Sequence, residues 1–158
     1  MDNWPIYAAA GWALFLGVVG GLLTPLSTWY FNLKKPAWQP PDWLFGPAWT
    51  VILGLGGWSA ANAWYAAGND AERQAVVILF AVNGVCHLLW SPLFFKLRRP
   101  DWALVEVVFL WASLLALIVG LWQISVLSSL LILPYFAWVS FAAVLNRAIV
   151  RLNGPFGR

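Results

Sequence analysis

The sequence predicts an all-α membrane protein, a bundle of five transmembrane helices. The chain of 158 residues is 62% hydrophobic and only 9% charged, with a mean hydropathy of +0.75, whereas soluble globular domains carry about 25% charged residues. Its apolar runs are continuous and do not alternate with period two, which favours helices over a membrane β-barrel. The connectors are too short for a soluble domain, so residues 1–158 are expected to form a single membrane domain.

Five segments are long enough to cross about 30 Å of hydrocarbon. The chain begins Met1-Asp2-Asn3-Trp4 without the basic region of a secretory signal, so the first segment is interpreted as a retained helix. It ends at Thr24-Pro25, and the second ends at the turn signal Gly68-Asn69-Asp70. The third ends in a basic cluster followed by Pro100, and the fifth carries arginines at its end. The expected helices span residues 6–23, 44–67, 74–95, 102–122 and 128–150.

Charge indicates the orientation of these helices. With five crossings, the first loop, the third loop and the C-terminal tail share one side of the membrane. The opposite side holds Arg73 with Asp2, Asp70 and Glu72. The positive-inside rule therefore predicts an external N-terminus and a cytoplasmic C-terminus. Anchoring also explains the net charge of +3 without a nucleic-acid partner. The basic residues of the first side are Lys34, Lys35, Lys96, Arg98, Arg99, Arg147, Arg151 and Arg158.

The connector over residues 25–43 gathers tryptophans and prolines with two lysines. Tryptophan at headgroup depth keeps its N–H in water and its ring in hydrocarbon. The pair Pro40-Pro41 holds the chain extended and prevents a flanking helix from running through it. We therefore expect a stiff aromatic loop that caps the mouth of the helix bundle.

Small residues mark two helix faces. Gly17 and Gly21 form a GxxxG pattern, and Gly54, Gly57 and Ala61 mark a thin edge on the second helix. Such faces permit close approach of helices in a bilayer. Packing within one chain and a homodimer seam are both consistent with this pattern.

Nine short motifs follow one another along the chain: Trp29-Tyr30, Leu33-Lys34-Lys35-Pro36, Trp38-Gln39-Pro40-Pro41, Phe45-Gly46-Pro47, Trp49-Thr50, Trp90-Ser91-Pro92-Leu93-Phe94-Phe95, Pro134-Tyr135-Phe136-Ala137-Trp138, Leu145-Asn146 and Leu152-Asn153. With these motifs the chain resembles the TspO/MBR family of tryptophan-rich sensory proteins, also called translocator proteins or peripheral-type benzodiazepine receptors. The resemblance covers nearly the whole chain, in order.

The resemblance implies a five-helix bundle, often a homodimer, with a pocket under the first loop. Members are associated with porphyrin and haem, and some with sterol or benzodiazepine-type drugs. Some bacterial members are reported to degrade porphyrin in light, a role that would fall on Trp49 and Trp138. The sterol pattern is absent, because Tyr135 has no basic residue within about five positions. The ligand-binding positions implied are Tyr30, Pro40, Trp49, Asn83, His87, Trp90, Trp138 and Ala142.

Helical spacing supports part of this pocket. Asn83, His87 and Trp90 lie at i, i+4 and i+7 on one face, which should point into the bundle. The face can be a pocket wall or a hydrogen-bonded helix contact, and His87 can be a haem ligand or a satisfied polar contact. Trp138 lies too deep in its helix for an interfacial belt, which favours stacking on a flat apolar ligand.

Three charged residues have more than one interpretation. Glu106, inside the fourth segment, is expected to snorkel to the interface or to pair with Lys96, Arg98 or Arg99, and a proton-coupled role in transport is the alternative. Lys34 and Lys35 can meet porphyrin propionates at the pocket mouth or lipid phosphates. No metal-binding spacing, phosphate loop or hydrolase triad is present.

Three functions follow from these observations. The first is a tetrapyrrole-binding receptor or transporter that takes part in tetrapyrrole homeostasis or stress signalling and requires no resident cofactor. The second is a light- and oxygen-dependent porphyrin-degrading activity. The third is a membrane scaffold without a functional pocket.

Overall fold

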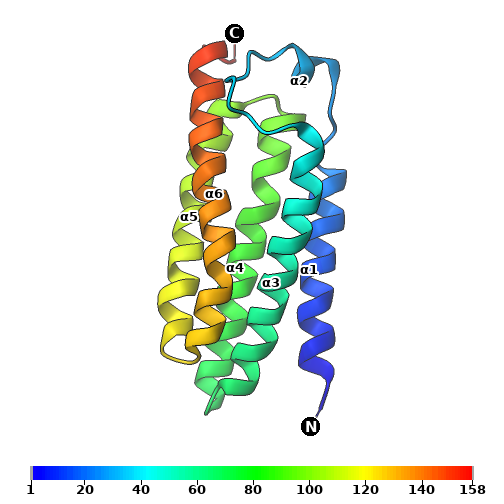
Figure 1. Cartoon of the computed structure of the whole chain (residues 1–158). Helices are drawn as coiled ribbons and strands as arrows, with labels where there is room; N and C mark the ends of the chain where they lie inside the picture. The colour runs from blue at the N-terminus through cyan, green and yellow to red at the C-terminus, as the bar shows by residue number, and fades with distance from the viewer. Residues whose placement is uncertain (1, 158) are drawn as a thin grey trace.

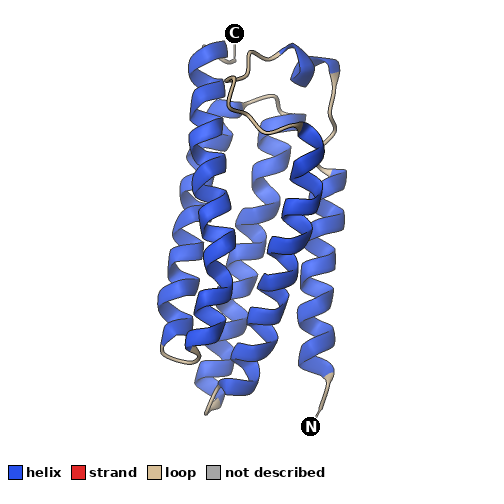
Figure 2. Ribbon diagram, viewed as in Figure 1, coloured by secondary structure: helices blue, strands red, loops and turns tan. Residues whose placement is uncertain are grey.

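The computed structural model describes residues 2–157, and these form a bundle of five long helices with no strand among them (Figures 1 and 2). All five are long and apolar enough to cross a membrane. The predicted fold class, a five-helix membrane bundle, is confirmed. The five helices are α1 (Trp4–Leu22), α3 (Phe45–Ala66), α4 (Asp70–Ser91), α5 (Pro100–Trp122) and α6 (Val126–Asn153).

The two termini lie at opposite ends of the bundle, and the connector between α1 and α3 lies at the C-terminal end (Figure 1). This connector contains a short helix, α2 (Thr28–Asn32), and a 3-10 turn, η1 (Asp42–Leu44). Arg73 therefore lies at the end opposite to the other basic residues in the described range. Arg158, which the charge argument also used, lies outside the described residues. The orientation relative to the cell stays a prediction.

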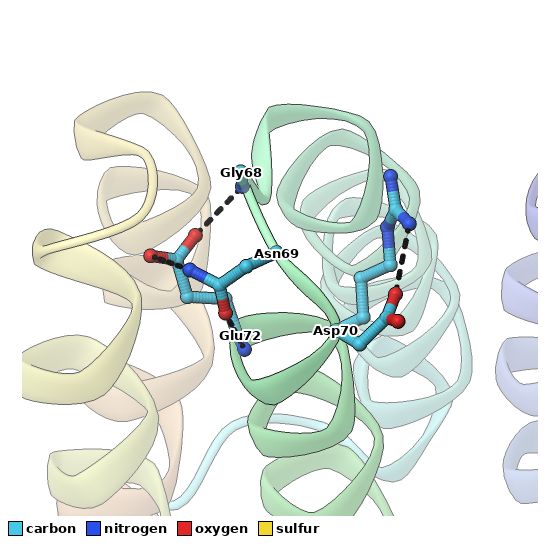
Figure 3. A network of polar contacts seen from close by, with 5 residues as sticks. Gly68, Asn69, Asp70 and Glu72 are labelled. Carbon is cyan, nitrogen blue, oxygen red and sulfur yellow. Dashed lines mark hydrogen bonds and ion pairs between the residues drawn. The ribbon is translucent and has the colours of Figure 1, made fainter.

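The turn between α3 and α4 shows why α4 begins at Asp70 and not near residue 74. Asn69 caps the helix, since its side-chain oxygen accepts a hydrogen bond from the Glu72 amide at 2.9 Å. Glu72 reaches back to accept from the Gly68 amide at 2.7 Å (Figure 3). This capping box satisfies amides that the first turn leaves free. The charged residues 70–73, which hydropathy assigns to a loop, thus form the first turn of the helix.

The predicted helix over residues 74–95 is not one regular helix. The α-helix α4 ends at Ser91, and a π-helical turn, η2 (Pro92–Lys96), follows. The neighbouring side chains Phe94 and Phe95 are both buried. A wider turn of this kind is rare and occurs mostly as a single turn within or after an α-helix. It carries two successive aromatic side chains into the interior at the loop end of the bundle.

The helices form a ring in the order α1, α3, α6, α5, α4. Glycine allows α1 and α3 to approach closely, because a Cβ on Gly57 would lie 3.1 Å from the carbonyl oxygen of Ala9. This is packing within one chain. Gly21 and Gly54 have nothing within 4 Å of an added Cβ, so the homodimer seam stays a prediction.

Buried asparagine and serine side chains link helices that approach each other. Ser59 on α3 donates to the Ser128 carbonyl on α6 at 2.7 Å. In the amide orientation that satisfies both of its partners, Asn146 on α6 accepts from the Leu104 amide at 2.9 Å and donates to the Pro100 carbonyl at 3.3 Å. Asn146 thereby bonds to both the amide and the carbonyl of one backbone pair in the first turn of α5. Such bonds hold helices together where the lipid environment gives no hydrophobic drive.

Candidate functional site

A large cavity runs between the helices, from the connector at the loop end along α1 and α3 toward the opposite end of the bundle. Its volume is about 1250 Å³, above the usual 300–1,000 Å³ of small-molecule pockets. Residues from all five long helices, from η2 and from the α1–α3 connector line it. The lining is mostly apolar or aromatic. The cavity therefore suits an extended apolar ligand.

Trp49 on α3 is the centre of the aromatic wall. Its ring lies edge-on to His87 at 4.9 Å, to Tyr135 at 5.8 Å and to Trp138 at 6.3 Å, measured between ring centroids. On the next turn of α4, Trp90 stacks on Phe94 at 5.0 Å. Aromatic pairs in such geometries fix one another's orientation. The wall therefore offers ring faces and edges in set positions to a flat ligand.

Trp12 on α1 fills the bundle beside this wall. Its ring lies 3.1 Å from the position of a Cβ on Gly56 and 3.1 Å from that on Gly84. The indole N–H donates to the Phe80 carbonyl at 3.1 Å. Two glycines on different helices are therefore needed to accommodate one indole. Trp12 itself is not among the residues that line the cavity.

His87 is held between α6 and α1. Its Nδ1 lies 2.8 Å from the Tyr135 hydroxyl, and its Nε2 lies 3.5 Å from the place of a Cβ on Gly20. The ring is thus oriented by Tyr135, with Nε2 directed toward α1. No group of three or more His, Cys, Asp or Glu side chains suited to a metal ion occurs within residues 2–157.

Three residues of the connector form a polar cluster over the cavity. The Tyr30 hydroxyl donates to Asp42 Oδ1 at 2.7 Å, and Gln39 Nε2 lies 3.4 Å from both groups. All three residues line the cavity. Burial, followed by the Asp42 carboxylate, raises the pKa of Tyr30 well above its usual value. The phenol therefore stays a neutral hydrogen-bond donor, and the cluster holds the connector in shape.

The connector is also attached to the end of α6. The Lys34 amide donates to Asn153 Oδ1 at 2.8 Å, and Asn153 Nδ2 donates to the Lys34 carbonyl at 2.8 Å. One amide side chain thus pairs with both backbone groups of one residue. This pairing, called the Lys34–Asn153 latch below, closes the loop over the bundle.

Several buried polar atoms of cavity residues have no partner within the described chain. They are the indole nitrogens of Trp90 and Trp138 and the amide oxygen of Gln39. Buried polar groups are normally hydrogen-bonded. These atoms are covered on the cavity side as well, so a ligand can satisfy them only if the side chains that carry them turn toward the cavity.

The structure brings together six of the eight residues predicted to bind ligand: Tyr30, Trp49, His87, Trp90, Trp138 and Ala142. Pro40 does not line the cavity, although its neighbour Gln39 does. Asn83 does not line it either. It is fully buried, and its Nδ2 donates to Ser113 Oγ on α5 at 3.1 Å. Asn83 therefore makes the helix contact that was the alternative interpretation of this face.

Sequence reasoning missed Gln39 and Asp42 as cavity residues. Gln39 belongs to the Trp-Gln-Pro-Pro motif, and Asp42 is the one carboxylate in residues 25–43. A lone acidic residue in an aromatic membrane loop was the available signal. Neither Lys34 nor Lys35 lines the cavity, so the structure gives no support to lysine contacts inside it.

The expected ion pair of Glu106 is wrong. Glu106 is 8% exposed, and neither of its carboxylate oxygens has a partner within residues 2–157. Arg99 instead pairs with Asp101, with Nε 2.8 Å from Oδ1. Lys96 and Arg98 are exposed. Glu106 lies on the inner side of α5, out of reach of basic residues whose side chains extend to the surface.

These features define a class: an integral, multi-pass membrane protein with an aromatic pocket among its helices and a loop closed over it. The chain belongs to the TspO/MBR family, whose model matches residues 9–152. It is 38% identical over 145 residues to the tryptophan-rich protein TspO of Chlorobaculum tepidum, covering 90% of this chain and 92% of that protein.

Two further relatives extend the comparison. Protein CrtK of Rhodobacter capsulatus is 38% identical over 140 residues, which is 87% of this chain and 85% of the relative. The human translocator protein is 33% identical over 126 residues, 79% of this chain and 75% of the relative. Bacterial and animal members of the family are therefore both similar to this chain.

Proposed function

We propose that this protein binds a tetrapyrrole, porphyrin or haem, in the cavity under the connector and acts as a membrane receptor or transporter. In this role it takes part in tetrapyrrole homeostasis or stress signalling. The observation that carries the proposal is the apolar cavity of about 1250 Å³ walled by Trp49, Trp90, Trp138 and His87. A porphyrin is a flat, rigid, apolar macrocycle, and indole rings give it contact area with little loss of side-chain entropy.

The unpaired polar groups support the same proposal. The indole N–H groups of Trp90 and Trp138 lack acceptors, and a tetrapyrrole carries several acceptor atoms that these groups would meet if the indole rings turned toward the cavity. Haem ligation by His87 would fall to Nε2, since Nδ1 is engaged by Tyr135, and it would require α1 to move away from Nε2 at Gly20. Sterols and benzodiazepine-type drugs are further proposed ligands of the cavity, and a homodimer is the proposed assembly.

A second candidate function is light- and oxygen-dependent porphyrin breakdown. The observation that favours it is that the Trp49 and Trp138 rings both line the cavity with centroids 6.3 Å apart. An excited porphyrin beside these rings can accept an electron from an indole, and molecular oxygen is the oxidant that consumes the resulting radicals. A scaffold without a working pocket is the third candidate and predicts no saturable binding.

Titration of protoporphyrin IX into the detergent-solubilised protein separates these functions. Tryptophan fluorescence is followed in the dark and porphyrin absorbance under illumination, with Trp49→Phe and Trp138→Phe alongside. Saturable quenching with an unchanged porphyrin spectrum is the expected result. Loss of absorbance that needs light and either tryptophan would establish breakdown instead. Folded protein without saturable quenching would leave the scaffold as the remaining function.

A further inference from the structure

Tyr135 on α6 lies behind the aromatic wall, outside the ligand space. It is 1% exposed and does not line the cavity, whereas Trp49 and His87 both line it. The rings of Trp49 and Tyr135 meet edge-on, with centroids 5.8 Å apart, which is within the range of interacting aromatic pairs. Trp49 therefore links the ligand space to a fully buried phenol.

The Tyr135 hydroxyl is paired with a base. Its oxygen lies 2.8 Å from His87 Nδ1, and it bonds to no other acceptor within residues 2–157. A buried hydroxyl normally donates its proton. Nδ1 is therefore the acceptor, and the neutral imidazole carries its own proton on Nε2, the nitrogen directed toward Gly20.

This pairing makes the phenol a suitable electron donor. A phenol that loses an electron becomes strongly acidic, and a positive charge left on it in an apolar interior would be costly. The short hydrogen bond to His87 gives the proton a place to go as the electron leaves. Tyr135 can thus be oxidised to a neutral radical, whereas an indole that loses an electron is left as a radical cation.

We infer that Tyr135 and His87 form a redox relay that restores Trp49 after an excited porphyrin has oxidised it. The inference rests on the proposed porphyrin binding and on the electron transfer of the second candidate function. The excited porphyrin takes one electron from Trp49. Tyr135 then gives one electron to the Trp49 radical cation, its O–H bond breaks, and the proton forms an N–H bond at His87 Nδ1. Molecular oxygen takes the electron from the reduced porphyrin and becomes superoxide.

The relay leaves an intact indole, a neutral tyrosyl radical and an imidazolium. Superoxide can return its electron to the tyrosyl radical while His87 returns the proton, which restores the Tyr135 hydroxyl and releases oxygen. This cycle consumes no porphyrin and is compatible with a receptor or transporter. Without the relay, the oxidised ring of Trp49 persists at the cavity wall, where oxygen-derived radicals add to it irreversibly.

The test is electron paramagnetic resonance on the whole detergent-solubilised protein with protoporphyrin IX, frozen during illumination in air. The protein is prepared once with ring-deuterated tyrosine and once with ring-deuterated tryptophan, because deuterium narrows only the signal of the residue type that carries the radical. The wild-type signal should narrow with deuterated tyrosine. In Tyr135→Phe it should narrow with deuterated tryptophan instead, and mass spectrometry should find oxygen added to Trp49 sooner than in wild type.

Three further variants separate the steps of the relay. His87→Phe removes the proton acceptor, and Trp49→Phe removes the ring that links Tyr135 to the cavity. Each should lose the tyrosyl signal although Tyr135 is retained. Tyr30→Phe is the competing variant, because Tyr30 lines the cavity and donates to a carboxylate, but its ring pairs with phenylalanines and not with Trp49. It should keep the tyrosyl signal, measured per bound porphyrin.

Three results would overturn the inference while the proposed binding stands. They are a wild-type protein without a light-induced tyrosyl signal, a tyrosyl signal that survives in Tyr135→Phe, and one that is lost in Tyr30→Phe. If Tyr135→Phe does not fold, an undiminished tyrosyl signal in His87→Phe or Trp49→Phe overturns it equally. Tryptophan quenching in the dark is measured first on every variant. If protoporphyrin IX does not bind wild-type protein saturably, the proposed function itself fails, and the inference with it.

Discussion

The Lys34–Asn153 latch is predicted to control opening of the connector over the pocket. Asn153→Ala removes two hydrogen bonds of 2.8 Å to the Lys34 backbone. Each hydrogen bond of this kind contributes about 0.5–1.5 kcal/mol net, and water replaces part of it at this exposed site. We therefore expect a loss of about 1–2 kcal/mol in the free energy that closes the loop. Since 1.4 kcal/mol is a factor of ten, the open fraction should rise about 5- to 30-fold.

Amide hydrogen exchange, measured by mass spectrometry on the detergent-solubilised protein, checks this prediction. In Asn153→Ala, exchange over residues 28–44 should accelerate by that factor, while exchange in α5 stays unchanged. The matched control is Asn69→Ala, which removes an asparagine cap at the opposite end of the bundle. In this control variant, amide exchange should accelerate in the α3–α4 turn only. Unchanged loop exchange in Asn153→Ala, or an equal rise throughout α5, would refute the reasoning.

Three further predictions concern packing, burial and orientation. Gly57→Ala should lower the free energy of unfolding by about 1–2 kcal/mol, because its Cβ would meet the Ala9 carbonyl at 3.1 Å. Gly54→Ala should leave this free energy unchanged, because an added Cβ there meets open space. Equal thermal midpoints of the two variants in detergent would contradict the prediction. Glu106→Gln should not lower the thermal midpoint, because the carboxylate has no partner to lose. The affinity for porphyrin should stay within twofold of wild type. A large drop in the thermal midpoint or in the affinity would show that Glu106 has a partner or a role in binding. In a Cys86→Ser background, an impermeant thiol reagent on intact cells should label Asn69→Cys but not Lys96→Cys, and the reverse pattern would invert the predicted topology.

Hydropathy was sufficient to predict the five helices, because each crossing needs about 20 apolar residues and each run has them. The ends of α4 could not be predicted in this way. Its first turn is charged and depends on the Asn69–Glu72 cap, and its last turn is π-helical. Both features are local hydrogen-bond arrangements that an average over apolar residues does not register.

The candidate site was predicted in part. The depth of Trp138 within its segment indicated an interior position, and the structure places its ring beside Trp49. Asn83 was misplaced relative to the cavity, although its helical spacing from His87 is right. Helical spacing shows which residues share one face of a helix, but it does not show which part of the protein packs against each turn of that face. The turn at Asn83 packs against Ser113 of α5.

The charged residues show the same limit. The sequence places Glu106 about one turn into its helix, close to three basic residues along the chain. Rotation about the helix axis decides whether its side chain faces them, and in the structure it faces inward. Asp42 was overlooked for the opposite reason, since a loop has no periodicity from which direction can be predicted.

The central claim is that the ligand occupies the cavity between the aromatic side chains. Ala142→Phe tests it most directly, because Ala142 on α6 lines the cavity and the added ring would fill ligand space. Ala137→Phe is the matched control, since Ala137 lies exposed on the outer side of the same helix. The dissociation constant of protoporphyrin IX should rise at least tenfold in Ala142→Phe and stay within twofold in Ala137→Phe. Equal affinities in the two folded variants would contradict the claim and place the ligand elsewhere on the bundle.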